Sequence, residues 1–201
     1  MPDLKWVRHD AYKTSIEYLA FITESDSRFT RTPCPIYEVA KNAGLAVFNF
    51  DLGDSLAGML YDNHIVVARN YGPERARFTV AHEIGHAVLH LPRAESDPGP
   101  TEVEEHEANV FASGLLMPHD AVRQILPLGT KILTVRQWAM DEHRTRQVSR
   151  LRRQFRVSLD TTLQTLVDMG LVLDREPWAS LFNVRDEYER ALRDLQGAGG
   201  A

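Results

Sequence analysis

Two histidines and one glutamate in the stretch RFTVAHEIGHAVLH, residues 77–90, have the types and spacing of a metal-dependent hydrolytic site. His82 and His86 are four residues apart, so on a helix their imidazoles lie one turn apart on one face, as two ligands of a tetrahedral ion. Glu83 is rotated about 100° from His82, so it can lie beside the metal without binding it. That placement suits a general base acting on water. The alternative is an ordinary amphipathic helix whose polar side faces solvent.

The helix that must position these residues is predicted from Pro73 to about Leu91, where Pro92 ends it. Glu74 suits the positive end of the helix dipole. A stripe on the other face is expected to anchor the helix in the core, and it consists of Ala81, Ile84, Val88 and Leu91. Gly85 costs helix stability, so it indicates that another segment packs closely there.

A catalytic zinc needs a third protein ligand and one open position. The stretch EEHEANVFASGLLMP, residues 104–118, places Glu105 on one helix face with Ala108, Asn109 and Ala112. A carboxylate on that face could reach the metal, and Asn109 could hydrogen-bond a ligand histidine. The rivals for the third ligand are Glu104, His106, Glu107 and His90. A straight helix cannot wrap three successive turns around one ion, so His90 is interpreted as a neighbour of the ligands or a surface residue.

The segments before this site predict a small sheet. A first helix is expected at 4–22 and a short one within PCPIYEVAKNAG, followed by a strand at 45–50. Residues 56–69 read as a hairpin around Asp62 and Asn63. The sequence therefore predicts three short antiparallel strands and an α+β fold with segregated helices. An exposed edge of the hairpin could hold a peptide as an added strand; the alternative is that these strands only form core.

Further helices and one short strand are expected after the site, at 102–116, 119–126, 134–142, 144–155, 158–169, 170–173 (the strand) and 184–195. Residues 144–155 and 158–169 resemble a helix-turn-helix in spacing. The arginine run at 144–156 could meet phosphates or an acidic partner protein, or be simply solvated. DNA-binding proteins with this motif usually contact the nucleobases through the second helix. Here that helix carries two acidic residues and no basic residue, so direct DNA binding is disfavoured.

Composition narrows the class of protein. The chain has 201 residues, 43% of them hydrophobic, which allows a substantial core without disulfides. The single cysteine, Cys34, fits a reducing compartment. The N-terminus lacks the features of a secretory signal, and no apolar run approaches bilayer length, so a cytoplasmic protein without membrane contact is expected. A net charge of -5 argues against a generally nucleic-acid-binding protein. The predicted domains are 1–126, a helical part at 127–175, and a helix with a frayed tail at 176–201.

The two quoted stretches together resemble the ImmA/IrrE family of metallo-endopeptidases, which is similar to the gluzincins. The resemblance covers about residues 10–172. It implies a zincin-like fold with two active-site helices, with His82, His86 and Glu105 as ligands and Glu83 as the base. Zinc suits this ligand set, with manganese as the alternative.

The same resemblance implies a substrate class, helix-turn-helix repressors, whose cleavage releases regulated genes in a stress response, a mobile element or a toxin–antitoxin-like pair. Candidate donors for the transition state are Tyr61, Tyr71 and His119, and the sequence does not choose among them. The rival function is a non-catalytic regulatory module that binds a repressor or DNA through the arginine helix. The sequence sets neither the activating signal nor the oligomeric state.

Overall fold

The structure, a computed structural model, describes residues 4–25, 32–53, 56–90, 99–126, 133–173, 188–190 and 193. The chain divides into two units, Met1–Pro118 and His119–Ala201. Among the described residues, no helix is both long and apolar enough to cross a membrane. The domain boundaries expected after residues 126 and 175 stay a prediction about organisation.

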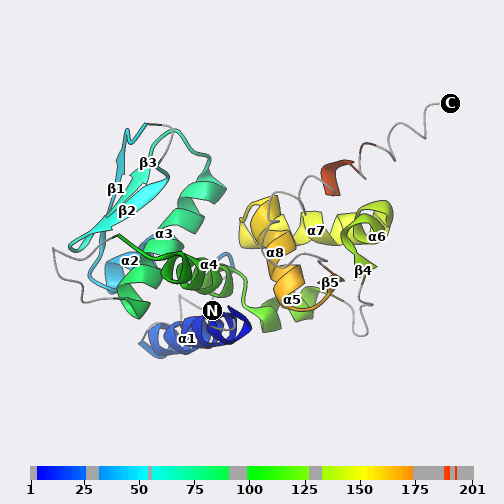
Figure 1. The fold of residues 1–201 in the computed structure, drawn as a ribbon, viewed down its shortest axis with the longest axis horizontal. Coiled ribbons are helices and arrows are strands. Elements are labelled where there is room, and N and C mark those ends of the chain that lie inside the picture. The colour runs from blue at the N-terminus through cyan, green and yellow to red at the C-terminus, as the bar shows by residue number, and fades with distance from the viewer. Residues whose placement is uncertain are drawn as a thin grey trace. The chain divides into compact units, whose positions relative to one another are not determined.

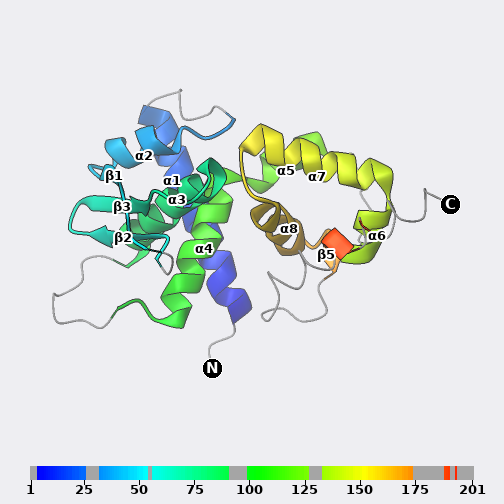
Figure 2. The same cartoon turned by 90° about the horizontal axis from the view of Figure 1, so that it is seen from above.

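The first unit is built in layers around one central helix. Its elements are α1 (Leu4–Ser25), α2 (Ile36–Asn42), β1 (Ala46–Phe50), β2 (Gly58–Tyr61), β3 (His64–Ala68), α3 (Pro73–Leu89) and α4 (Glu102–Leu116). Helix α3 contacts strands β2 and β3 as well as α2 and α4, and α4 in turn contacts α1. Figures 1 and 2 show this succession of sheet, α3, α4 and α1. The α+β fold class predicted from the sequence is confirmed.

The sheet is mixed, and the prediction that all three strands are antiparallel is wrong. The hairpin is confirmed: β2 and β3 pair antiparallel, with Tyr61 opposite His64 on either side of the Asp62–Asn63 turn. Strand β1, however, pairs parallel with β3, which gives the order β1-β3-β2. A parallel neighbour requires a crossover, and the chain makes it by passing from β1 through β2 before returning as β3. Strand β2 therefore lies at an edge of the described sheet.

Helices α3 and α4 approach closely at Gly85. A Cβ atom added to Gly85 would lie 3.1 Å from Phe111 Cδ1 and 3.2 Å from Ala108 Cα. Any larger side chain would push the helices apart, which confirms the close packing predicted for this glycine. Helix α3 begins at Pro73 as predicted, and it ends at Leu89. Helix α4 begins with a reciprocal capping box between Thr101 and Glu104.

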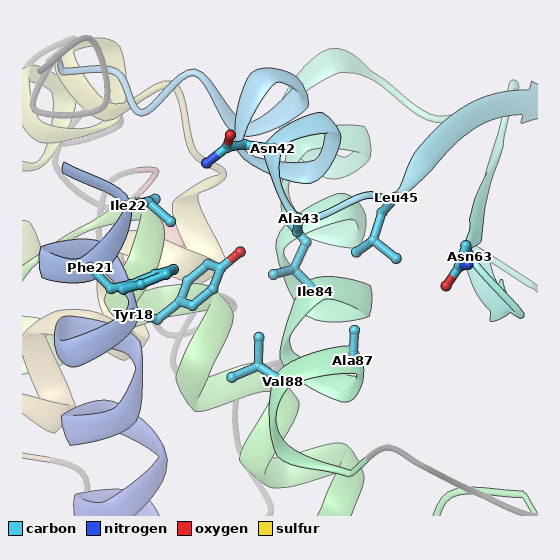
Figure 3. Close-up of a pocket in the computed structure, with 10 residues that line it drawn as sticks. All are labelled: Tyr18, Phe21, Ile22, Asn42, Ala43, Leu45, Asn63, Ile84, Ala87 and Val88. Atoms are coloured by element: carbon cyan, nitrogen blue, oxygen red, sulfur yellow. The ribbon is translucent and has the colours of Figure 1, made fainter. Parts of the chain in front are cut away.

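A cavity of about 320 Å³ lies beside α3 (Figure 3). Ile84 and Val88 of its lining follow His82 and His86 by two residues, which turns them about 200° around the helix, so the cavity lies on the side of α3 that faces away from those histidines. The cavity is lined by α1, α2 and α3 and the segments beside them, through Tyr18, Phe21, Ile22, Asn42, Ala43, Leu45, Asn63, Ile84, Ala87 and Val88. Val88 is 36% exposed, so its prediction as a core residue is wrong, whereas Ala81 and Ile84 are buried as predicted. Leu91 lies outside the described residues.

The second unit is helical. Its elements are α5 (His119–Ile125), β4 (Leu133–Thr134), α6 (Val135–Met140), α7 (Glu142–Phe155), α8 (Leu159–Asp168) and β5 (Val172–Leu173). Strands β4 and β5 pair in parallel, and β4 was not predicted. Trp138 on α6 is fully buried and donates from Nε1 to the Leu171 carbonyl at 3.1 Å.

Helices α7 and α8 pack against each other. Val148, Leu151, Phe155 and Leu166 are buried, and Leu159 is partly exposed. Arg156 ends α7 in the left-handed region at φ 52°, and Ser158 caps α8. Of the final helix predicted at 184–195, only residues 188–190 and 193 are described, and they are helical.

Candidate metal centre

Three side chains from α3 and α4 converge on one point. His82 Nε2 and His86 Nε2 lie 3.0 Å apart. Glu105 reaches both, with Oε2 at 3.3 Å from His82 Nε2 and Oε1 at 3.4 Å from His86 Nε2. Among the described residues, these three form the group of His, Cys, Asp and Glu side chains that could hold a metal ion. The structure thus brings together the ligand set implied by the sequence.

The donor set fits a tetrahedral zinc ion. With metal–ligand bonds of roughly 2.0–2.1 Å, neighbouring donors of a tetrahedral ion are separated by about 3.3 Å. The two Nε2 atoms lie 3.0 Å apart, and they lie 3.3 and 3.4 Å from the two oxygens of Glu105, so the three side chains surround a space of about this size. A hydrogen bond from His82, with further contributions from His86, holds the pKa of Glu105 below its usual value. Glu105 is thus an anion at neutral pH, as a ligand must be.

Each ligand histidine has a partner for its other ring nitrogen. Nδ1 of His82 lies 3.0 Å from Asn109 Oδ1. Nδ1 of His86 lies 2.9 Å from Nδ1 of His90, whose Nε2 is 2.9 Å from Glu107 Oε2. Asn109 and His90 therefore contact these two histidines and lie outside the group of described residues that could hold a metal ion, and their supporting role stays a prediction. Such partners set the tautomer and orientation of a ligand imidazole.

The rivals for the third ligand have other contacts. Glu104 Oε2 accepts a hydrogen bond from the Thr101 backbone at 2.7 Å as part of the capping box. Glu107 is paired with His90, and His106 lies outside the cluster of potential ligands among the described residues. Of these side chains, Glu105 is the one that lies beside both His82 and His86, and it is 47% exposed.

Glu83 is buried on α3 next to the cluster. Only 6% of its surface is exposed, and burial raises its pKa to about 7, with Glu105 adding to the rise. His82 and a hydrogen bond from the Leu60 backbone act in the opposite direction. A carboxyl whose pKa lies near neutrality can both take up and release a proton. The arrangement can therefore supply a general base beside a metal.

The three candidate transition-state donors lie in different places. Tyr61 at the end of β2 is 68% exposed. Residues 58 and 61 face opposite sides of the strand, so Tyr61 points away from the side on which Gly58 lies against Thr79 of α3. Tyr71 precedes α3, where the Arg75 guanidinium lies 5.3 Å from its ring. His119 begins α5 in the second unit, and burial lowers its pKa to about 4. A donor role for each of the three stays a prediction.

Two contributors to the site escaped the sequence reasoning. Leu60 acts through its backbone N–H, which no side-chain pattern reveals. Glu107 appeared as a rival ligand rather than as the partner of His90. A readable signal did exist for the start of α4: the Thr-x-x-Glu pattern at Thr101 and Glu104 indicates a capping box, which fixes where Glu105 falls on the helix.

Comparison with known proteins identifies the family of this chain. A solved structure of a Mycobacterium tuberculosis transcriptional regulator is similar, with 18% sequence identity and a TM-score of 0.47, over 83% of this chain and 52% of that one. This chain thus spans about half the length of that regulator. Among curated proteins, none matches the chain. The family described as Peptidase_M78, IrrE N-terminal-like domain, matches residues 40–167, which include α3, α4 and all three ligand candidates. The chain belongs to this metallopeptidase family of IrrE N-terminal-like domains.

Proposed function

We propose that the protein is a zinc-type metallo-endopeptidase, with His82, His86 and Glu105 as metal ligands and Glu83 as the general base. The observation that carries this proposal is the convergence of three side chains beside a buried carboxyl. The Nε2 atoms of His82 and His86 lie 3.0 Å apart, and they lie 3.3 and 3.4 Å from the two oxygens of Glu105. Three protein ligands leave a fourth position open, as in catalytic rather than structural zinc sites. A purely structural site would have no use for Glu83.

The chemistry divides between the ion and the chain. His82, His86 and Glu105 would hold a divalent ion, which would supply Lewis acidity to the scissile carbonyl and to the attacking water. Glu83 takes a proton from the attacking water and then passes it to the leaving amine. A pKa of about 7 suits both transfers, because the carboxyl is neither a strong acid nor permanently protonated at neutral pH.

The edge of β2 offers a place for the peptide. The Ala57 carbonyl accepts a hydrogen bond from the Ala68 backbone, so residue 57 faces β3. Backbone groups alternate along a strand, so those of Gly58 and Leu60 point to the outer edge. The Leu60 backbone donates to Glu83 there, and this edge therefore lies beside the base. A substrate strand added at this edge would carry its peptide bonds past Glu83.

We further propose that the substrate is a helix-turn-helix transcriptional repressor, a class suggested by the likeness to the ImmA/IrrE family. The decisive experiment mixes the protein with the repressor encoded next to it, in zinc and in excess chelator. Cleavage is expected only with metal. Glu83→Gln should abolish cleavage but retain zinc, whereas the control Glu74→Gln, an exposed carboxylate on the same helix, should cleave normally.

The same experiment distinguishes the rival function. If the wild type binds the repressor without cutting it, and Glu83→Gln behaves identically, the protein is a binding module and the peptidase proposal is wrong. Exposed arginines on α7, among them Arg146, Arg150 and Arg153, would then be the first residues to test for binding.

A further inference from the structure

We propose that Glu107 is a positioning residue of the metal centre, acting through His90 to hold the ring of His86 in its metal-binding form. This inference rests on the proposed metal centre and deepens it. The contacts form a continuous chain from α4 back to α3: Glu107 Oε2 lies 2.9 Å from His90 Nε2, and His90 Nδ1 lies 2.9 Å from His86 Nδ1. His86 Nε2 at the far end faces Glu105 and His82.

The donor and the acceptor in each of these contacts follow from the number of hydrogens on each group. An ionised carboxylate only accepts hydrogen bonds, so the hydrogen between Glu107 and His90 belongs to His90 Nε2. In a neutral imidazole the other nitrogen is then an acceptor, and His90 Nδ1 accepts the hydrogen of His86 Nδ1. His86 consequently has its lone pair at Nε2, the atom that faces the other two donors. The carboxylate of Glu107 thus selects the tautomer of a residue that it does not touch.

Burial makes the two linking contacts effective. The side chains of His86 and His90 are only 10% and 7% exposed, and that of Glu107 is 27% exposed. Water therefore competes weakly for the ring nitrogens, and an unmade hydrogen bond there would be costly. The contacts of His90 with Glu107 and His86 cross the interface between α3 and α4. The distance between the two helices is fixed by the contact of Gly85 with Ala108 and Phe111.

The two ligand histidines are held differently. His82 is supported directly by the neutral amide of Asn109, whereas His86 is supported by an anion through a second ring. Helix α4 therefore supplies both a ligand, Glu105, and a second carboxylate two residues later that supports another ligand. Loss of such a supporting group weakens metal affinity by about 10- to 100-fold in other metal sites.

The test measures metal binding by the full chain. Zinc affinity is determined by competition with a chromophoric chelator, and cobalt is used as a second probe because its visible absorption reports the coordination geometry. Glu107→Leu, which removes the hydrogen-bond acceptor, should weaken zinc binding by about 10- to 100-fold and change the cobalt spectrum. The control Glu102→Leu, at an exposed carboxylate in the first turn of the same helix, should do neither.

A double-mutant cycle shows whether His90 transmits the effect. His90→Ala should weaken zinc binding by itself, and adding Glu107→Leu to that variant should then change little. Circular dichroism and urea unfolding in excess chelator verify that each variant folds. Unchanged zinc affinity in Glu107→Leu would overturn the proposal, and so would effects of the two substitutions that simply add.

The outcomes separate this inference from the proposed function. If Glu107→Leu weakens zinc binding but the wild type cleaves no repressor, the positioning role of Glu107 stands and the peptidase proposal fails. If the wild type cleaves a repressor but Glu107→Leu binds zinc normally, the peptidase proposal stands and the positioning role is wrong.

Discussion

The backbone of Leu60 donates a hydrogen bond to the carboxylate of Glu83, so the outer edge of β2 and the candidate base are directly joined. One contact thereby links the strand that would hold a peptide to the group that would activate water. Because the contact lowers the pKa of Glu83 against the larger effect of burial, it also bears on the pH at which the base is ionised.

Leu60→Pro tests this link. The residue's backbone points away from β3, so a proline there keeps the sheet pairing but removes the N–H that Glu83 accepts. Without that hydrogen bond the pKa of Glu83 rises, so the acid limb of the cleavage pH profile should move to higher pH. We also expect kcat/KM to fall by about 10²-fold, with unchanged zinc affinity. Leu60→Val keeps the N–H and serves as the control; an equal pH shift in that variant would contradict the link.

Glu83→Gln should stabilise the metal-free protein at neutral pH. Burial raises the folded pKa of Glu83 from an ordinary 4.5 to about 7, so the folded state binds this proton more tightly than the unfolded one. The contribution of this bound proton to the free energy of unfolding is fully present below pH 4.5, and it is lost as the pH rises through 7. The variant should therefore gain on the order of 1–3 kcal/mol over the wild type above pH 7, and almost nothing at pH 4.

Urea unfolding in excess chelator across this pH range measures the difference. Glu74→Gln controls for removing a carboxylate from the same helix. A gain in Glu83→Gln that is the same at pH 4 and pH 8 would show that burial does not raise the pKa of this group.

Zinc should raise the melting temperature of the wild type. An ion that binds only the folded state adds about 2.7 kcal/mol at 100 times its Kd, which corresponds to roughly 5–10 °C for a protein of this size. His86→Ala should lose most of this shift because it removes a ligand. His64→Ala, which alters an exposed histidine on β3, should keep it, and equal shifts in the two variants would place the zinc site elsewhere.

Gly58→Ala should displace β2 from α3. The added Cβ would lie 2.3 Å from Thr79 Cγ2 and 2.8 Å from the Val66 carbonyl oxygen, so the strand must move. We expect a loss of about 1–3 kcal/mol in the free energy of unfolding, and a larger loss of cleavage than of zinc affinity. Gly99→Ala, whose Cβ would meet no atom within 4 Å, is the matched control. Wild-type cleavage by Gly58→Ala would show that the position of β2 is unimportant.

The sequence by itself determined the local half of the site. A four-residue spacing on a helix puts His82 and His86 one turn apart whatever surrounds them, and the turn at Asp62 and Asn63 sets the hairpin. Gly85 likewise indicated a close helix contact before any partner was known. These features follow from short-range geometry, which the order of residues contains.

Only the tertiary structure decided the relations between segments. The parallel pairing of β1 with β3 leaves β2 at the edge next to Glu83, and no alternation of polar and apolar residues specifies that order. The rotation of α4 against α3 sends Glu105 to the ligand histidines and Glu107 to His90, although both carboxylates belong to one acidic run. The strand order and the rotation of α4 depend on how helix and sheet faces that are distant in the sequence pack together. A small rotation of α4 would place a different carboxylate beside the histidines.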